Sequence, residues 1–202
     1  MIIQLDEVSA NQRYFTIIQS LVPRPIAWVL SRNADTALNL ARFSYFSGGS
    51  SDPPLLMLSI GKKPDGTWKD TRENIVERSD FVVHIPHREQ AGAVTESSRS
   101  LAANESELDA VGLDTTAFGD FSVPRLADCR IAMACERYRV EDITGSQTMV
   151  LGLIKAVYAD DGVITLEQGR PKIHADKIDP LARLGGNEYA SIGNIIDVPR
   201  PK

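Results

Sequence analysis

Several features that define large classes of protein are missing from this chain of 202 residues. It contains no apolar run near the roughly 20 residues that a membrane-spanning helix needs, so we expect no membrane segment. The N-terminal MIIQLDEVSA lacks the basic-then-apolar pattern of a secretory signal, which favours a cytoplasmic location. The 22 Lys and Arg residues against 27 Asp and Glu give a net charge of −5, which offers no electrostatic support for nucleic-acid binding.

Cysteine is scarce, and its spacing excludes a disulfide framework. The chain has two cysteines, Cys129 and Cys135, six residues apart in the segment ADCRIAMACERY. Six residues along a strand carry two side chains too far apart for a disulfide, and the spacing is not that of a metal site. We therefore predict that both are buried thiols.

Histidine is also scarce, which limits both metal binding and nucleophilic catalysis. The chain has three, His84, His87 and His174. Pro86 stands between the first two and breaks any helix that would align them as ligands, so we predict no metal site. The serines around GSS lack the G-x-S-x-G elbow that presents a nucleophile, and few histidines are available as a base.

Short strand-like segments dominate what the chain does contain. Its hydrophobic fraction of 43% is enough for a sizeable core, and we predict a single domain over residues 1–202. Six apolar runs are predicted as strands, at residues 26–31, 55–60, 81–85, 130–140, 150–158 and 163–166. The run VLGLIKAVY is typical of an interior strand, and the DDG at 160–162 predicts a hairpin to the next run.

Helical segments are fewer and do not alternate with the strands. One face of the helix predicted over residues 10–22 carries Tyr14, Ile17, Ile18 and Leu21. Asp70 followed by Glu73 resembles a capping box at the start of DTRENIVER. Residues 89–97 and 106–111 are predicted as two more short helices. This order disfavours a parallel doubly wound sheet and predicts a closed antiparallel barrel with helices packed outside it.

The triplet Lys69-Asp70-Thr71 stands where the helix over DTRENIVER should begin. Free backbone N–H groups and the positive end of the helix dipole suit a phosphate there, with a cation from Lys69 and a hydroxyl from Thr71. The Asp70 carboxylate would repel an anion unless it turned to the helix amides or to another donor. Equally, Asp70 could cap a surface helix whose lysines are solvated.

The segment NLARFSYFSGGSSDPP at residues 39–54 alternates aromatic and small polar side chains. Gly48 and Gly49 allow close backbone approach, and Pro53 begins a stiff entry to the next strand. Such a loop suits a flat ring that needs hydrogen bonds along one edge. The alternative is a strand–turn–strand unit whose aromatic residues pack in the core.

Two further segments carry arginine or glycine in unusual surroundings. In VPRPIAWVLS, Pro23 and Pro25 hold Arg24 extended, so that it could bind a phosphate or carbonyl or could simply begin a strand. In PLARLGGNEYASIG, a Gly-Gly pair lies beside Arg183 and Tyr189 in a polar tail. We expect this tail, about residues 175–202, to cover a site in its own subunit or in a partner.

Together these four segments resemble the flavin reductase-like, FMN-binding split-barrel family, in its flavoredoxin-type branch. The resemblance runs over nearly the whole chain, through VPRPIAWVLS, NLARFSYFSGGSSDPP, KDTRENI and PLARLGGNEY in that order. It implies a mainly β fold with peripheral helices, a Greek-key split β-barrel, a homodimer, and one FMN per subunit near the dimer interface.

The resemblance also implies where FMN would lie. The residues expected to line the ring and ribityl chain are Asn39, Ser44, Phe46, Ser50 and Ser51. Those expected near the phosphate are Arg24, Lys69, Asp70, Thr71 and Asn74. An FMN phosphate carries about −1.5 to −2 charge, which suits a lysine at a helix N-terminus. Arg183 and Tyr189 are expected to contact the substrate or the partner subunit.

The chain departs from the family pattern at two positions. Many members carry NLAPFSFF where this chain has NLARFSYF, so Arg42 replaces a proline and adds charge beside the site. Related reductases often show Gly-Asp-His before a long strand, whereas this chain has Gly-Ser-Gln-Thr, with Gln147 in place of the histidine. We assign no catalytic residue.

The function that follows is an FMN-dependent oxidoreductase, which takes electrons from NAD(P)H or a reduced partner and passes them to a flavin, a metal complex or another acceptor. The alternative is a non-catalytic FMN-binding electron carrier that serves a partner enzyme. A third possibility is a barrel that has lost its cofactor. No G-x-G-x-x-G fingerprint is present, so any NAD(P)H is expected to bind only transiently.

Overall fold

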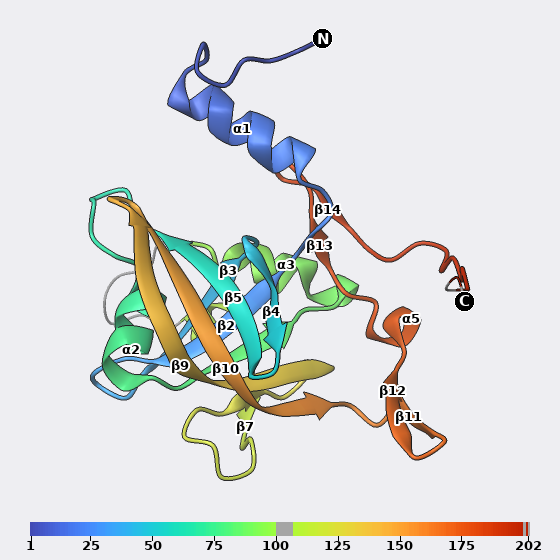
Figure 1. Cartoon of the computed structure of the whole chain (residues 1–202). Coiled ribbons are helices and arrows are strands. Elements are labelled where there is room, and N and C mark those ends of the chain that lie inside the picture. The colour runs from blue at the N-terminus through green and yellow to red at the C-terminus, as the bar shows by residue number, and fades with distance from the viewer. Residues whose placement is uncertain (100–106, 200, 202) are drawn as a thin grey trace.

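The computed structural model describes residues 1–99, 107–199 and 201, and its centre is a seven-stranded antiparallel sheet that curls into an open barrel (Figure 1). In spatial order the strands are β3 (Leu38–Phe43), β2 (Ala27–Arg32), β6 (Phe81–Ile85), β9 (Ile131–Thr144), β10 (Gln147–Ala159), β5 (Pro54–Gly61) and β4 (Phe46–Ser51). The strands predicted from the apolar runs are confirmed within a few residues of their ends. The fold is mainly β, as predicted.

The two edges of this sheet, β3 and β4, follow each other in the chain but do not pair within the described residues. A bend at Ser44 and Tyr45 joins them, and the Tyr45 carbonyl accepts a hydrogen bond from the Ser59 amide at 2.9 Å. The prediction of a closed barrel is therefore wrong, because the sheet stays open between β3 and β4. The segment over residues 39–54 is a strand–turn–strand unit that borders this opening.

The interior position predicted for the run VLGLIKAVY is confirmed, because β10 pairs with β9 on one side and β5 on the other. The predicted hairpin from this strand through 160–162 is wrong. β11 (Ile164–Glu167) pairs instead with β12 (Arg170–Ile173) in a separate hairpin, although the end of β10 beyond Leu153 pairs only with β9. The remaining short strands are β7 (Thr115–Thr116) with β8 (Arg125–Leu126), and β1 (Arg24–Pro25) with β13 (Ala182–Arg183) and β14 (Tyr189–Ala190).

The helices lie around the sheet (Figure 1). They are α1 (Ala10–Ser20), α2 (Asp70–Arg78), the 3₁₀ turn η1 (Arg88–Gln90), α3 (Ala91–Glu96), α4 (Glu107–Val111) and α5 (Ala175–Ile178). All four predicted helices are found, with residue 106 of the last one outside the described residues. No helix within the described ranges is long and apolar enough to cross a membrane.

Two helix ends differ from the predictions. The first helix stops at Ser20 rather than 22, because the residue before Pro23 is pushed away from helical backbone angles. The capping box expected at Asp70 is absent: Lys69 is the N-cap residue of α2, and no side chain caps this end. The start of α2 therefore keeps backbone N–H groups free for another partner.

Two apolar clusters fill opposite faces of the sheet. On β2, Trp28 and Leu30 pack in one cluster, and Val29 packs in the other, so this strand is buried on both faces. The same alternation places Val82 in the first cluster and Phe81 in the second. The central strands therefore fix the sheet firmly, and the open edges at β3 and β4 are left for a site.

The two cysteines lie in different clusters, one on each face of the sheet. Both Cys129 and Cys135 are free and buried, which confirms the prediction of buried thiols. Burial raises the pKa of Cys129 to about 12 and raises the pKa of Cys135 as well. Neither thiol is a nucleophile at neutral pH.

His84 is a fully buried core residue with both ring nitrogens occupied. The Leu126 amide donates to its Nε2 at 2.9 Å, so the ring proton lies on Nδ1, 3.0 Å from the Trp28 carbonyl. Burial lowers the pKa of His84 to about 4, a value that includes a smaller lowering by the charge of Arg125. The side chain is therefore a neutral structural link between β2, β6 and β8.

Arg24 ties three separate segments together at the base of the opening. Its guanidinium donates to the carbonyls of Ile18 and Leu21 at the end of α1 and, at 2.6 Å, to that of Leu184 after β13. Its Nε donates to Ser44 Oγ at 3.4 Å. The extended backbone imposed by the flanking prolines thus holds an arginine whose donors are spent largely on carbonyls.

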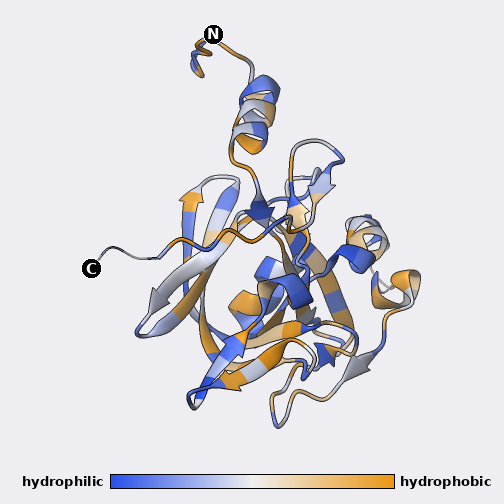
Figure 2. Ribbon diagram, turned by 90° about the vertical axis from the view of Figure 1, so that its right-hand side faces the viewer, coloured by the Kyte–Doolittle hydropathy of each residue, from blue (hydrophilic) through white to orange (hydrophobic). Residues whose placement is uncertain are grey.

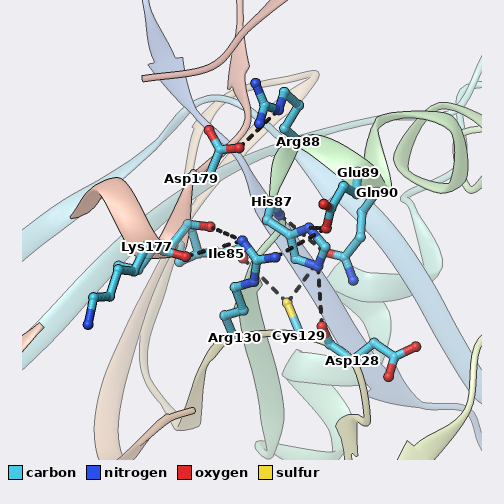
Figure 3. A network of polar contacts seen from close by, with 11 residues as sticks. Ile85, His87, Arg88, Glu89, Gln90, Asp128, Cys129, Arg130, Lys177 and Asp179 are labelled. Atoms are coloured by element: carbon cyan, nitrogen blue, oxygen red, sulfur yellow. Dashed lines mark hydrogen bonds and ion pairs between the residues drawn. The ribbon is translucent and has the colours of Figure 1, made fainter. Parts of the chain in front are cut away.

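The C-terminal segment is fixed to the sheet by a polar network around Arg130 (Figure 3). The Arg130 guanidinium donates to the carbonyls of Lys177 and Ile178 at 3.1 and 3.2 Å. Nearby, Arg88 pairs with Asp179 at 3.0 Å. This network anchors the chain just before it turns back as β13 toward the opening between β3 and β4.

The first prediction concerns His84 and acid. In the unfolded chain His84 binds a proton near pH 6.5, whereas in the folded protein it does so only near pH 4. Between these two pH values the unfolded state therefore binds more protons, so the free energy of unfolding falls as the pH falls. We expect a loss of about 3 kcal/mol from this group. Urea unfolding at pH 7 and pH 4.5 measures it. His84→Gln should flatten the profile, His174→Gln should not, and equal slopes for all three would contradict the assignment.

The second prediction concerns Arg24. Arg24→Met removes the donors to three carbonyls, so we expect the free energy of unfolding to drop by about 3 kcal/mol. Amide exchange over residues 184–190 should accelerate, because this segment loses its link to α1. The matched control is Arg139→Met, an exposed arginine paired with Glu141. A loss no greater in Arg24→Met than in the control would contradict the role.

Candidate functional site

Two adjoining hollows open at the split between β3 and β4, and they share Arg42, Lys69 and Ser98 in their walls. The smaller hollow, of about 170 Å³, is lined by Asn39, Ala41, Arg42, Lys63, Lys69, Asp70, Thr71, Ser97, Ser98, Arg99 and Glu107. The larger hollow, of about 490 Å³, is lined by Tyr14, Phe15, Ile18, Arg24, Arg42, Phe43, Ser44, Tyr45, Ser59, Gly61, Lys69, Ser98, Gln147, Arg183, Gly186 and Asn187. A ligand with two chemically different ends could lie across both.

The smaller hollow contains the start of α2, where the sequence suggested a phosphate site. Lys69, Asp70 and Thr71 all line it, and Asn39 of β3 joins them. The Asp70 carboxylate accepts a hydrogen bond from Lys63 Nζ at 2.6 Å. This ion pair offsets the negative charge of Asp70, so the acid can lie beside an anion site. The uncapped helix end, the lysine and the buried hydroxyl form a donor set that fits a phosphate.

Behind this hollow lies a buried network of side-chain amides and hydroxyls. Asn39 Nδ2 donates to Thr71 Oγ1 at 2.9 Å, which holds the hydroxyl in place. Asn74 Nδ2 donates to Ser31 Oγ at 3.0 Å and to Asn33 Oδ1 at 2.8 Å. Asn74, expected near the phosphate, therefore lies behind the wall, and it links α2 to β2 without lining either hollow.

Lys69 stands between the two hollows without an acidic partner. Its Nζ lies 5.4 Å from the centre of the Phe43 ring, and it forms no ion pair within the described residues. Burial lowers the pKa of Lys69, and the nearby Arg42 guanidinium lowers it further. A half-buried cation in this state favours an anionic ligand.

The larger hollow combines an apolar wall with polar groups from five strands. Tyr14 and Phe15 of α1 and Phe43 of β3 form apolar surface, which suits a planar ring. Gln147 of β10 donates through Nε2 to Ser59 Oγ on β5 at 2.7 Å. These groups converge only because β10 and β5 pair near the open edge.

The C-terminal tail reaches the larger hollow in its own chain. Gly185 packs directly against the Gln19 side chain of α1, where any Cβ would collide at 2.5 Å. Gly186 has a φ of +58°, and its carbonyl accepts from Arg183. The Gly-Gly pair therefore lets the tail approach α1 and turns Arg183 into the wall of the hollow, where the Tyr189 ring stacks on it at 4.7 Å.

The structure divides the other predicted residues between the larger hollow and places outside both hollows. Arg24, which was expected near the phosphate, lines the larger hollow and not the smaller one, and Ser44 lines the larger hollow too. Phe46, Ser50 and Ser51 lie on β4 and line neither hollow. The two serines are exposed on the open edge of the sheet, where Ser50 Oγ bonds the backbone of the following turn.

Several lining residues were not predicted as site residues, among them Tyr45, Ser59, Lys63, Ser98 and Arg99. Tyr45 stands within a segment that the sequence marked, so its neighbours offered a signal. Ser59, Ser98 and Arg99 reach the site only through long-range packing, and no local pattern distinguishes them. Tyr189 lies just behind the hollow, where its hydroxyl is 2.9 Å from the Thr95 hydroxyl.

Comparison with known proteins places the chain in a family. Residues 19–173 match a family model described as flavin reductase like domain. An uncharacterized protein of Halalkalibacterium halodurans is 34% identical over 202 residues, covering 97% of this chain and 94% of its own.

Two solved structures also superpose over nearly all of the chain. Nitrilotriacetate monooxygenase component B from Bacillus cereus does so with a TM-score of 0.90 and 30% identity, covering 98% of both chains. The 2-nitrobenzoate 2-nitroreductase of Pseudomonas fluorescens gives 0.89 and 32%, covering 100% of this chain and 96% of its own. Since the family model also covers most of the sequence, the chain belongs to the flavin reductase like family.

Proposed function

We propose that this protein binds FMN across the two hollows and acts as an FMN-dependent oxidoreductase. The observation that carries the proposal is Lys69, a half-buried cation with no acidic partner among the residues that the structure describes. It lies beside an uncapped helix N-terminus, at the junction of a small polar hollow and a larger one with aromatic walls. An anionic tail attached to a planar ring matches that pair of environments. Membership of the flavin reductase like family supports a flavin as the ligand.

The smaller hollow would hold the phosphate. Lys69 would supply a full charge, the first amides of α2 would supply backbone donors, and Thr71 would supply a hydroxyl that Asn39 keeps oriented. Among the described residues the hollow has two acids: Asp70 is paired with Lys63, and Glu107 accepts from the Leu40 amide at 3.3 Å. Burial raises the pKa of Glu107, which weakens its opposition to an anion, so the donors suit a dianionic phosphate better than a neutral group.

The larger hollow would hold the ring system. Phe43, Tyr14 and Phe15 would cover its apolar faces, and Ser44 and Gln147 would hydrogen-bond its polar edge. The flavin, when bound, supplies the redox chemistry, so the protein needs no acid, base or nucleophile of its own. The residues of this chain bind the cofactor, orient it and limit its contact with water.

We further propose that NAD(P)H or a reduced partner delivers electrons transiently at the same opening. The likeness to nitrilotriacetate monooxygenase component B and to a 2-nitrobenzoate 2-nitroreductase supports a small-molecule oxidoreductase. Oxidation of NAD(P)H by the FMN-loaded protein would distinguish an enzyme from an electron carrier, which would retain FMN without turnover.

The third prediction tests FMN binding at Lys69. We expect the wild-type protein to quench flavin fluorescence on titration with FMN. Lys69→Ala should raise the dissociation constant for FMN by about 10- to 150-fold, because it removes a hydrogen bond from a charged group. The matched control is Lys62→Ala, since Lys62 stacks on Trp68 and lines neither hollow.

Two outcomes would contradict this prediction. If the wild-type protein neither quenches flavin fluorescence nor gains thermal stability with FMN, the proposed function fails. If it binds FMN but Lys69→Ala matches the control, the phosphate lies elsewhere and only its placement is wrong.

We propose that the protein is a homodimer, with α1 at the interface. Figure 2 shows α1 projecting beyond the sheet, and several of its apolar side chains are exposed. Tyr14 is 53% exposed and Leu21 58% exposed, although the sequence places both on the apolar face of the helix. Because Tyr14 and Phe15 also line the larger hollow, a second chain packed here would complete the wall of the site.

The fourth prediction tests this assembly. We expect light scattering after size exclusion to give a mass of twice the 22.2 kDa chain at micromolar concentration. Leu21→Glu should shift the mass toward one chain, because it buries a charge in the proposed interface. Leu166→Glu, on the separate β11–β12 hairpin, should not. A wild-type mass of one chain would contradict the dimer.

A further inference from the structure

We propose that Arg42 and Arg183 form a subsite for one negatively charged group, a carboxylate or a phosphate, on a second small molecule that binds beside the cofactor. The proposal rests on the proposed function, since the second molecule would be the electron donor or acceptor. The two side chains come from distant parts of the chain, β3 and β13, and meet in the wall of the larger hollow.

The first argument is the charge that lines the hollows. Lys63 is paired with Asp70 and Arg99 with Glu96, so these four charges cancel. Four of the cations that line the hollows form no ion pair within the described residues: Arg24, Arg42, Lys69 and Arg183. Among the same residues, the one lining acid without an ion pair is Glu107. A phosphate of about −1.5 to −2 leaves roughly one positive charge unanswered.

The second argument is that the positive charge is concentrated in the larger hollow. Among the described residues its lining includes four cations and no Asp or Glu. Arg183 lines only the larger hollow, so it stands on the ring side and away from the proposed phosphate end. Burial lowers the pKa of Arg42 against an opposing effect of Tyr189, and the charge of Arg183 also lowers it. The two guanidinium groups therefore line one hollow and sense each other's charge across it.

The third argument is that these two arginines keep donors free. Arg24 spends its guanidinium on backbone carbonyls and on Ser44. Within the described part of the chain, Arg42 by contrast bonds only the Ser98 hydroxyl, at 3.2 Å, and its Nε is buried without a partner. Arg183 is held by the Gly186 carbonyl and the Tyr189 ring, which orient it but leave it uncompensated.

The position of Arg42 makes this a property of this chain. It stands where the motif of the family that the sequence resembles carries a proline, which has no charge and no donor. An uncharged residue there would leave Arg183 as the one guanidinium of the proposed subsite. The gain of a guanidinium beside an aromatic wall favours a planar ligand that carries an acid, either an aromatic carboxylate as acceptor or a nicotinamide dinucleotide as donor.

The test compares charged and neutral ligands on Arg42→Met. The acceptor arm uses 4-nitrobenzoate against nitrobenzene, and the donor arm uses NADH against 1-benzyl-1,4-dihydronicotinamide, which has no phosphate. We expect KM for the charged member of one pair to rise at least tenfold, and its neutral counterpart to change less than twofold. The arm that responds identifies the source of the anion.

A binding measurement and two further variants separate this role from simple loss of structure. Titration of the FMN-loaded protein with benzoate or pyrophosphate, followed by the flavin absorbance, should show the same weakening without turnover. Arg42→Lys should recover most of the affinity because it keeps the charge, and Arg139→Met should behave as wild type.

Other outcomes would overturn the subsite. If Arg42→Met weakens FMN itself tenfold while both members of each pair respond equally, Arg42 belongs to the cofactor phosphate. If Arg42→Met changes KM for neither 4-nitrobenzoate nor NADH, the subsite is absent. If the wild-type protein binds no FMN, the proposed function fails, and calorimetry of the cofactor-free protein with benzoate and pyrophosphate decides the subsite alone, with no difference between wild type and Arg42→Met refuting it.

Discussion

Positive charge held half-buried without a carboxylate partner is the constraint on which this site depends. Lys69 and Arg42 stand between the two hollows, and neither has an ion pair within the described residues. Keeping such groups charged away from bulk water costs free energy, which an anionic ligand offsets. The rest of the fold serves to keep them there, because the sheet remains open where its edges would otherwise close over them.

This local charge is the reverse of the charge of the whole molecule. The chain carries −5 overall, while the charged side chains that line the larger hollow are all cationic among the described residues. A cationic hollow in an acidic molecule is where an anion binds most favourably. Net charge alone therefore argues against nucleic acid as a partner, and the position of these cations favours a small anion.

Much of the fold and part of the site could be predicted from the sequence. Strand positions followed from short apolar runs, because the central strands are buried on both faces. Lys69, Asp70 and Thr71 were located because a helix start is a local feature, written in adjacent residues. The strand pairing was harder: β11 was expected beside β10 but pairs with β12, and the neighbour of the first half of β10 is β5, which lies about ninety residues earlier in the chain.

The remaining site residues could not be predicted for the same reason. Ser98, Gln147 and Arg183 meet only when three distant segments pack at one opening, and no local pattern records such a meeting. Conversely, Asn74 shares the buried face of α2 with Thr71, three residues earlier. One turn further along the helix, its side chain bonds Ser31 and Asn33 instead of lining a hollow. Local signals thus find where a site begins, and packing decides which neighbours complete it and therefore which ligand it accepts.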